Sequence, residues 1–192
     1  MDRNFHRFRS AWVVEAAPSL VYSVLERFTD YPKWWPEIRH LRLVGEEACE
    51  VICRSVLPHE LVMVLRPSRR DPDGHVLEAS MAGDLEGFSR WSITASPTGH
   101  GSTLIFDEEV VVVKPLLRRL GPIARPALRA NHALTMRHAK QGLAARLAGI
   151  HEVGGVMAPW SPPTYVVTDA GGTDDAVGGE RPDEVDPAAR SR

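Results

Sequence analysis

The chain of 192 residues is 43% apolar and 25% charged, a composition typical of one globular domain with a single core. No segment approaches the roughly 18 consecutive apolar residues of a membrane-spanning helix, and the basic start MDRNFHRFRS lacks the apolar stretch of a secretory signal. We therefore expect a cytoplasmic protein.

Two cysteines, Cys49 and Cys53, fit a reducing compartment. On a strand they share one face but lie too far apart to form a disulfide, and no neighbouring Cys or His gives the spacing of a zinc site. We expect both to be packing residues, and we expect neither a metal nor a cofactor.

The net charge of −2 hides a segregation of charge along the chain. Beyond Gly149 the sequence carries eight acidic residues against three arginines, and it is rich in Gly and Pro. That composition is typical of disorder. We expect a folded domain over 1–149 and a disordered acidic tail over 150–192.

The first expected elements are a strand within 4–16, a helix over 18–28 that opens at Pro18, and a short helical turn at 30–36. Six strands follow, separated by turn motifs such as DPDG and SPTGHG. They are expected at 39–46, 48–57, 59–67, 75–82, 85–95 and 102–113. A segment interrupted at Pro122 and Pro126 then leads into a long helix that ends near Gly149.

This order predicts an α+β protein, with about seven antiparallel strands, two short helices after the first strand and one long C-terminal helix. A sheet that one helix covers has to curl. Curling leaves a cavity between the concave face of the sheet and the helix.

The segment YPKWWPEI at 31–38 places Trp34 and Trp35 side by side where prolines allow neither a long helix nor a paired strand. Each indole buries roughly 150–250 Å², so both need cover. Neighbouring helical positions point in different directions. We expect one indole to anchor the turn and the other to line the cavity; the alternative is that both only pin the segment to the core.

Strand parity predicts the side chains that face the cavity. Glu108 shares a face of 102–113 with Leu104, Phe106, Val110 and Val112. A lone carboxylate there is costly, so it is paired with a cation, works as an acid or base with a raised pKa, or is turned outward by a β-bulge at DEEV. The other inward candidates are Leu61, Met63, Leu65, Leu77, Ala79, Met81, Trp91 and Ile93. The methionines suit a deformable pocket or simple gap filling.

The long helix carries an apolar stripe at helical spacing: Leu128, His132, Met136 or Thr135, Ala139, Leu143 and Leu147. Asn131 borders the stripe. Asn131 and His132 are its polar exceptions and are candidates to hold an oxygen of a ligand. The alternative for His132 is a simple hydrogen bond to a neighbouring residue.

Four motifs come in one order: WVVEAAPSLVYSVL, YPKWWPEI, GDLEGFSRWSI and NHALTMRHAKQGL. Together they resemble the polyketide cyclase/dehydrase and lipid-transport branch of the START-like (SRPBCC) superfamily, over about residues 5–149. The resemblance implies the helix-grip fold of START and Bet v 1 proteins and a cavity for a hydrophobic ligand. Only some members are enzymes, so it supports binding more strongly than any reaction.

Aromatic polyketide cyclases of this group orient their substrate with a Trp-Pro segment, a strand arginine and a helix asparagine. WWP at 34–36 and Asn131 match that pattern, whereas Arg66 follows Val64 and Leu65 where those enzymes tend to be aromatic. The candidate catalytic residues for an aldol cyclisation are Arg66, Glu108 and Asn131. The alternative for Arg66 is an ordinary surface arginine.

The expected ligand-binding residues share an inward position or lie in the Trp-Pro segment. They are Trp34, Trp35, Met63, Met81, Trp91, Phe106, Asn131, His132, Thr135 and Met136.

Between Glu109 and Glu152 the chain has no acidic residue but eight basic ones. Such a segment suits contact with an anionic membrane or an acidic carrier protein. The alternative is a solvated helix face balanced by the acidic tail. Nothing resembles a nucleic-acid-binding module, and GxSxG, HExxH, Walker and Rossmann signatures are absent.

Three functions follow from these patterns: a carrier of a lipid-like or polyketide-like molecule, a polyketide cyclase or dehydratase, and an accessory protein that docks through its basic helix. A cavity lined only by apolar side chains favours the first. Convergence of Arg66, Glu108 and Asn131 favours the second, and a filled interior favours the third.

Overall fold

The computed structural model describes residues 4–45, 47–54, 60–115 and 121–152, with the backbone alone for 121–124 and 151–152. The expected tail over 150–192 lies almost wholly outside these residues.

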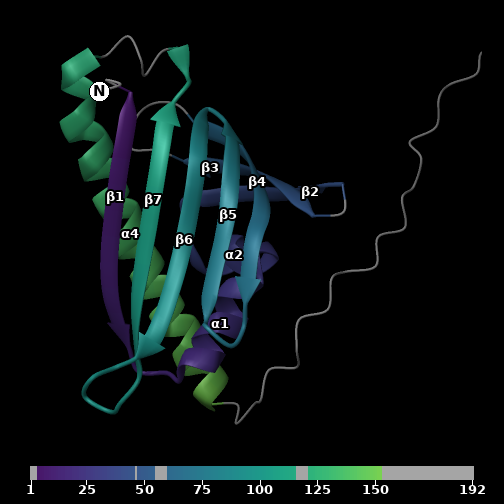
Figure 1. The fold of residues 1–192 in the computed structure, drawn as a ribbon, viewed down its shortest axis with the longest axis vertical. Helices are drawn as coiled ribbons and strands as arrows, with labels where there is room; N and C mark the ends of the chain where they lie inside the picture. Colours follow the sequence, from purple (N-terminus) through teal and green to yellow (C-terminus); the bar gives the residue numbers. More distant parts are fainter. Residues whose placement is uncertain (1–3, 46, 55–59, 116–120, 153–192) are drawn as a thin grey trace, which may run out of the picture. The chain divides into compact units, whose positions relative to one another are not determined.

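Seven strands form one antiparallel sheet in the order β1-β7-β6-β5-β4-β3-β2 (Figure 1). Their bounds are β1 Phe5–Val14, β2 Ile38–Val44, β3 Ala48–Arg54, β4 Glu60–Asp71, β5 Val76–Gly83, β6 Leu85–Ala95 and β7 Ser102–Val112. The first two strands are therefore the two edges of the sheet, and the chain between them has to cross its whole width.

That crossing consists of α1 (Pro18–Glu26), a 3₁₀ turn at Phe28–Asp30 and α2 (Tyr31–Trp34). The long helix α4 (Gly121–Glu152) lies behind β1, β7 and β6 in Figure 1, with α1 and α2 on the same side of the sheet. A curved antiparallel sheet that holds one long helix, with short helices after the first strand, confirms the predicted α+β helix-grip fold.

The core joins the helices to the middle of the sheet. Leu25 of α1, Leu143 of α4, Ile93 of β6 and Leu104 of β7 are all almost fully buried. Burial of such a side chain contributes roughly 1.5–3 kcal/mol. The apolar stripe predicted for α4 faces this core through Met136, Ala139, Leu143 and Leu147, which are buried.

Strand β4 is longer than its sequence predicted. Pro67 was expected to end the strand, but β4 continues to Asp71. The ladder between β4 and β5 shifts register between Pro67 and Arg69, and such an irregularity accommodates a residue without an N–H in a central strand. Asp71 then accepts a hydrogen bond from the Gly74 backbone N–H (2.8 Å), which closes the expected turn.

Helix α4 is also longer than predicted. The expected interruption at Pro126 is wrong, since this proline lies inside a continuous helix that starts at Gly121. Pro126 lies only five residues from the start. Its missing N–H costs one bond, to the carbonyl of Pro122, while the long segment that follows packs on the core.

One close approach fixes α2 against α4. The backbone carbonyl of Trp34 lies directly over Gly142, where the Cβ of any other residue would collide with the carbonyl oxygen. The two helices therefore touch backbone to backbone at this point, which explains a glycine in the middle of a helix.

Candidate functional site

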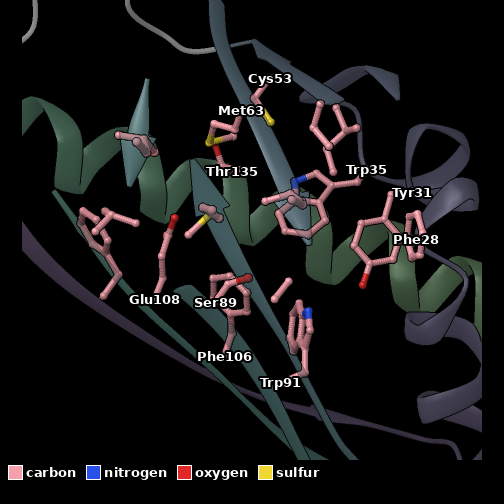
Figure 2. Close-up of a pocket in the computed structure, with 18 of the residues that line it drawn as sticks. Phe28, Tyr31, Trp35, Cys53, Met63, Ser89, Trp91, Phe106, Glu108 and Thr135 are labelled. Atoms are coloured by element: carbon pink, nitrogen blue, oxygen red, sulfur yellow. The ribbon is translucent and has the colours of Figure 1, made fainter. Parts of the chain in front are cut away.

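A cavity of about 230 Å³ lies between the sheet, α4 and the α1–α2 segment (Figure 2). It is larger than the roughly 150 Å³ engineered cavity that takes up benzene. Its lining is mostly apolar and aromatic, and it comes from all seven strands and from helices α1, α2 and α4. The inward faces predicted from strand parity supply much of it, including Leu61, Met63, Leu65, Leu77, Ala79 and Met81.

Aromatic rings form much of the wall. Trp91 of β6 packs against Phe106 of β7, with ring centroids 4.6 Å apart, and Trp35 and Tyr31 lie across the cavity from this pair (Figure 2). Burial raises the pKa of the Tyr31 phenol, whose O–H donates to the Leu25 carbonyl at 2.8 Å. Flat apolar walls of this kind favour a flat or cyclic guest.

The two neighbouring indoles have different positions. Trp34 is buried against Tyr31 (4.8 Å) and does not line the cavity, whereas Trp35 does. The indole N–H of Trp35 is buried and has no hydrogen-bond partner among the described residues. Asp30, just before α2, makes no side-chain cap and instead pairs with Lys33 at 2.6 Å.

Glu108 faces the cavity, and its carboxylate points into the space between β7 and α4 (Figure 2). The β1–β7 and β6–β7 ladders continue through it without a register shift, so no bulge turns it outward. Its Oε2 lies 3.2 Å from Nε2 of His132, and both side chains are only 14% exposed. Nε2 nevertheless lacks a hydrogen bond among the described residues, so the pair is close but poorly aligned.

His132 is held by aromatic stacking. Its ring lies 4.3 Å from Phe8 and nearly parallel to it, and Phe8 in turn stacks on His6 at 5.9 Å. Burial, followed by the charges of Arg125 and Arg129, lowers the pKa of His6. This stack fixes the plane of the His132 imidazole beside Glu108.

A second carboxylate and histidine join the Trp-Pro segment to α4. Glu37 Oε1 lies 2.5 Å from Nδ1 of His138, and Glu37 Oε2 is buried without a hydrogen-bond partner among the described residues. Glu37 also lines the cavity. Helix α4 is thus tied to two walls of the cavity by polar pairs, His132 to β7 and His138 to the start of β2.

The thiol pKa of Cys53 reflects its burial and the negative charge of the cavity walls. Burial, together with the charges of Glu108 and Glu37, raises the pKa of its thiol to about 12. Burial likewise raises the pKa of Cys49 to about 11. Both cysteines are free thiols that line the cavity, in agreement with their expected role as packing residues.

Arg66 is exposed and does not line the cavity, because it lies on the opposite face of β4 from Met63, Leu65 and Pro67. Arg69 and Arg70, which follow the register shift after Pro67, line the cavity instead. Convergence of Arg66 with Glu108 and Asn131 therefore does not occur.

Every other expected site residue except Trp34 lines the cavity. Met63, Met81, Trp91, Phe106, Glu108, Asn131, His132, Thr135 and Met136 do so, together with Trp35. The sequence did not single out Glu37, Ser89, Phe8 or the arginines Arg54, Arg69 and Arg70, which also line it. Parity with Trp91 could have identified Ser89. Glu37 carries no periodic signal, because it follows a proline outside any strand.

Three lining residues near the ends of β4 are exposed. Arg54 is exposed and pairs in register with Glu60 at the start of β4, while the exposed Arg69 and Arg70 lie near its end. Among the described residues no three His, Cys, Asp or Glu side chains are grouped to hold a metal ion. No helix in the described part of the chain is long and apolar enough to cross a membrane.

A curved sheet that grips one helix over an apolar cavity defines the class of helix-grip proteins that bind hydrophobic molecules. The family model described as "polyketide cyclase / dehydrase and lipid transport" matches residues 6–148, and the chain belongs to this family. This confirms the resemblance seen in the four sequence motifs. No curated protein matches the sequence.

Similar solved structures share this fold. The ZhuI aromatase/cyclase from Streptomyces sp. R1128 matches with a TM-score of 0.67 at 15% identity, over 79% of this chain and 99% of that one. A START superfamily protein from Mycobacterium smegmatis matches with a TM-score of 0.60 at 19% identity, over 76% and 99%. The di-domain aromatase/cyclase BexL of the BE-7585A pathway gives 0.57 at 15% identity, over 76% and 51%.

Proposed function

We propose that the protein binds a lipid-like or polyketide-like small molecule between its sheet and α4, as a carrier or binding protein. The observation that supports this most directly is the open cavity of about 230 Å³ with aromatic walls. An interior that served only as a core would be filled by its own side chains to close-packed density.

Native mass spectrometry of the purified full chain tests the proposal, followed by extraction of whatever co-purifies. We expect a hydrophobic molecule to co-purify with the protein. If the protein purifies empty, we expect it to bind the fluorescent hydrophobic probe Nile red. A protein that is empty and also fails to bind Nile red would contradict the proposal.

A matched pair of variants locates the binding site. Ala79 faces the cavity from β5, and Ser80 beside it is exposed on the other face of the same strand. We expect Ala79→Phe to weaken Nile red binding, because the added ring occupies the cavity. Ser80→Phe should leave binding unchanged. Equal effects of the two substitutions would place the probe elsewhere.

A second candidate function is catalysis of the cyclase or dehydratase type. The observation that favours it is a carboxylate beside an imidazole inside an apolar cavity, with Asn131 in the same lining. Such a pair is suited to move a proton from carbon to oxygen. The exposed position of Arg66 counts against the arginine-assisted version of this chemistry.

Conversion and binding can be separated in the same sample. The molecule extracted from the protein is incubated with wild type and with Asn131→Ala, and the mixture is examined by mass spectrometry. An enzyme is expected to remove water or to form a ring, and the variant to do so more slowly. With a pure carrier, Asn131→Ala alters affinity at most, and the molecule keeps both its mass and its retention in the chromatography that precedes the mass measurement. Ring closure without loss of water conserves mass and is detected by the change in retention.

A further inference from the structure

Glu108 is the polar group most directly presented to a ligand in this cavity. Its carboxylate points into the space between β7 and α4, near Ser89, Phe106 and Thr135 (Figure 2). An ionised carboxylate accepts hydrogen bonds and donates none. A guest that reaches it gains most by offering a donor, since hydrogen bonds to charged groups are roughly twice as strong as neutral ones.

The protein itself does not satisfy this acceptor. His132 approaches Glu108 Oε2 to 3.2 Å, but without the alignment of a hydrogen bond. The stack on Phe8 holds the imidazole in its plane, so it cannot turn freely toward Glu108. Among the described residues Glu108 therefore has an ionic neighbour and no hydrogen-bond donor.

A second buried carboxylate, Glu37 on the wall formed by the start of β2, adds negative charge to the cavity. Glu37 Oε2 is buried and unpartnered among the described residues, while Oε1 is taken by His138. Both carboxylates act on Cys53, whose thiol ionises only at a raised pKa of about 12 in part because of them. The cationic lining residues Arg54, Arg69 and Arg70 are exposed, outside this buried region.

We propose that the ligand carries a hydroxyl group that donates to the carboxylate of Glu108, and that carboxylate-bearing molecules such as free fatty acids are rejected from this part of the cavity. The inference rests on the proposed function and narrows its ligand to a hydroxylated, largely apolar molecule. The ring walls of Trp91, Phe106 and Trp35 favour a cyclic skeleton for it.

Three probes of one shape test this: 2-naphthol, 2-methoxynaphthalene and 2-naphthoate, each titrated into the full-length protein by calorimetry at neutral pH. The ether matches the alcohol in skeleton but has no donor. We expect 2-naphthol to bind about tenfold more tightly than the ether. The alcohol donates a charge-assisted hydrogen bond to Glu108, and the ether has no hydrogen to donate. The carboxylate should bind more weakly than both.

Variants assign the discrimination to one residue. Glu108→Leu removes both the charge and the hydrogen-bond acceptor. We expect it to bring the ratio of the affinities for 2-naphthol and 2-methoxynaphthalene close to one, and to improve binding of 2-naphthoate. Glu108→Gln keeps the shape of the side chain and should reduce the ratio. Glu109→Leu is the matched control, because Glu109 pairs with Arg7 away from the cavity; its ratio should equal that of wild type.

The outcomes separate this inference from the proposed function. If no probe binds wild type, the proposed function fails and the inference with it. If 2-naphthol and its ether bind equally, or if the preference survives in Glu108→Leu, the hydroxyl inference is overturned while binding in the cavity stands. The wild-type comparison decides the matter even if neither Glu108 variant folds.

Discussion

The backbone contact between α2 and α4 can be tested by the substitution Gly142→Ala, which adds one methyl group at the point of contact. In an exposed helix a Gly→Ala substitution stabilises by about 0.8–1.0 kcal/mol. At Gly142 the new Cβ would overlap the carbonyl oxygen of Trp34, a backbone atom that no side-chain rotation can move. Overpacking of this kind costs about 1–3 kcal/mol. Gly142→Ala is therefore expected to destabilise the protein by up to about 2 kcal/mol once the helix gain is subtracted.

Gly149 provides the matched control on the same helix, since a Cβ there would meet nothing within 4 Å. Gly149→Ala should be neutral or stabilise by up to about 1 kcal/mol. Urea unfolding measures both changes. In a thermal melt, Gly142→Ala should lower Tm by up to roughly 8 °C, and Gly149→Ala should leave Tm equal or higher.

The contact also predicts an effect on binding. Displacing α2 moves Trp35, which follows Trp34 and lines the cavity. Gly142→Ala should therefore weaken Nile red binding, and Gly149→Ala should not. A stabilising Gly142→Ala with unchanged binding would refute the backbone contact and the reasoning built on it.

Three further predictions concern charge and reactivity. Because burial and two nearby carboxylates raise the pKa of Cys53 to about 12, iodoacetamide at pH 8 should modify it far more slowly in the native protein than in urea, as measured by mass spectrometry; equal rates would contradict its burial. Burial tends to raise the pKa of Asp84, but hydrogen bonds from Lys114 and the Val62 N–H hold it below its usual value. The pair therefore stabilises the fold above the ordinary aspartate pKa of roughly 3.9 and loses its effect as pH falls through the lowered value, so the stability lost in Asp84→Asn should shrink in acid; a constant difference would argue against the pair. The exposed cations Arg129, Arg137 and Lys140 of α4 predict salt-sensitive sedimentation with anionic phospholipid vesicles, weakened in Arg129→Glu/Arg137→Glu but not in Arg42→Glu; no sedimentation at low salt would remove the membrane interpretation.

The order of the elements along the chain, the antiparallel sheet and the long helix could be predicted from sequence, because alternation and helical spacing act over a few residues. The inward direction of Glu108 also followed from parity, once the ladders showed no bulge. Pro67 and Pro126 misled for the same reason: local propensity argues against a strand or helix at proline, and tertiary packing overrides a single lost hydrogen bond.

The polar part of the site depended on contacts that sequence spacing does not encode. Glu37 and His138 are 101 positions apart and meet because α4 crosses the Trp-Pro segment. Arg66 was a candidate only through the resemblance to the cyclases, whereas parity with Met63 and Leu65 already places it on the outer face of β4, where the structure has it.

The sheet order has a consequence for how the molecule is made. β1 pairs only with β7, so the first strand to leave the ribosome waits for about a hundred residues before its neighbour is synthesised. Until β7 is made, β1 and the β6 edge of the growing sheet both lack their partner strand and can pair with other chains, a state prone to aggregation. Helix α4, which covers the hollow, is made last among the described elements. The concave face of the sheet is therefore exposed to solvent in the nascent chain until α4 is made.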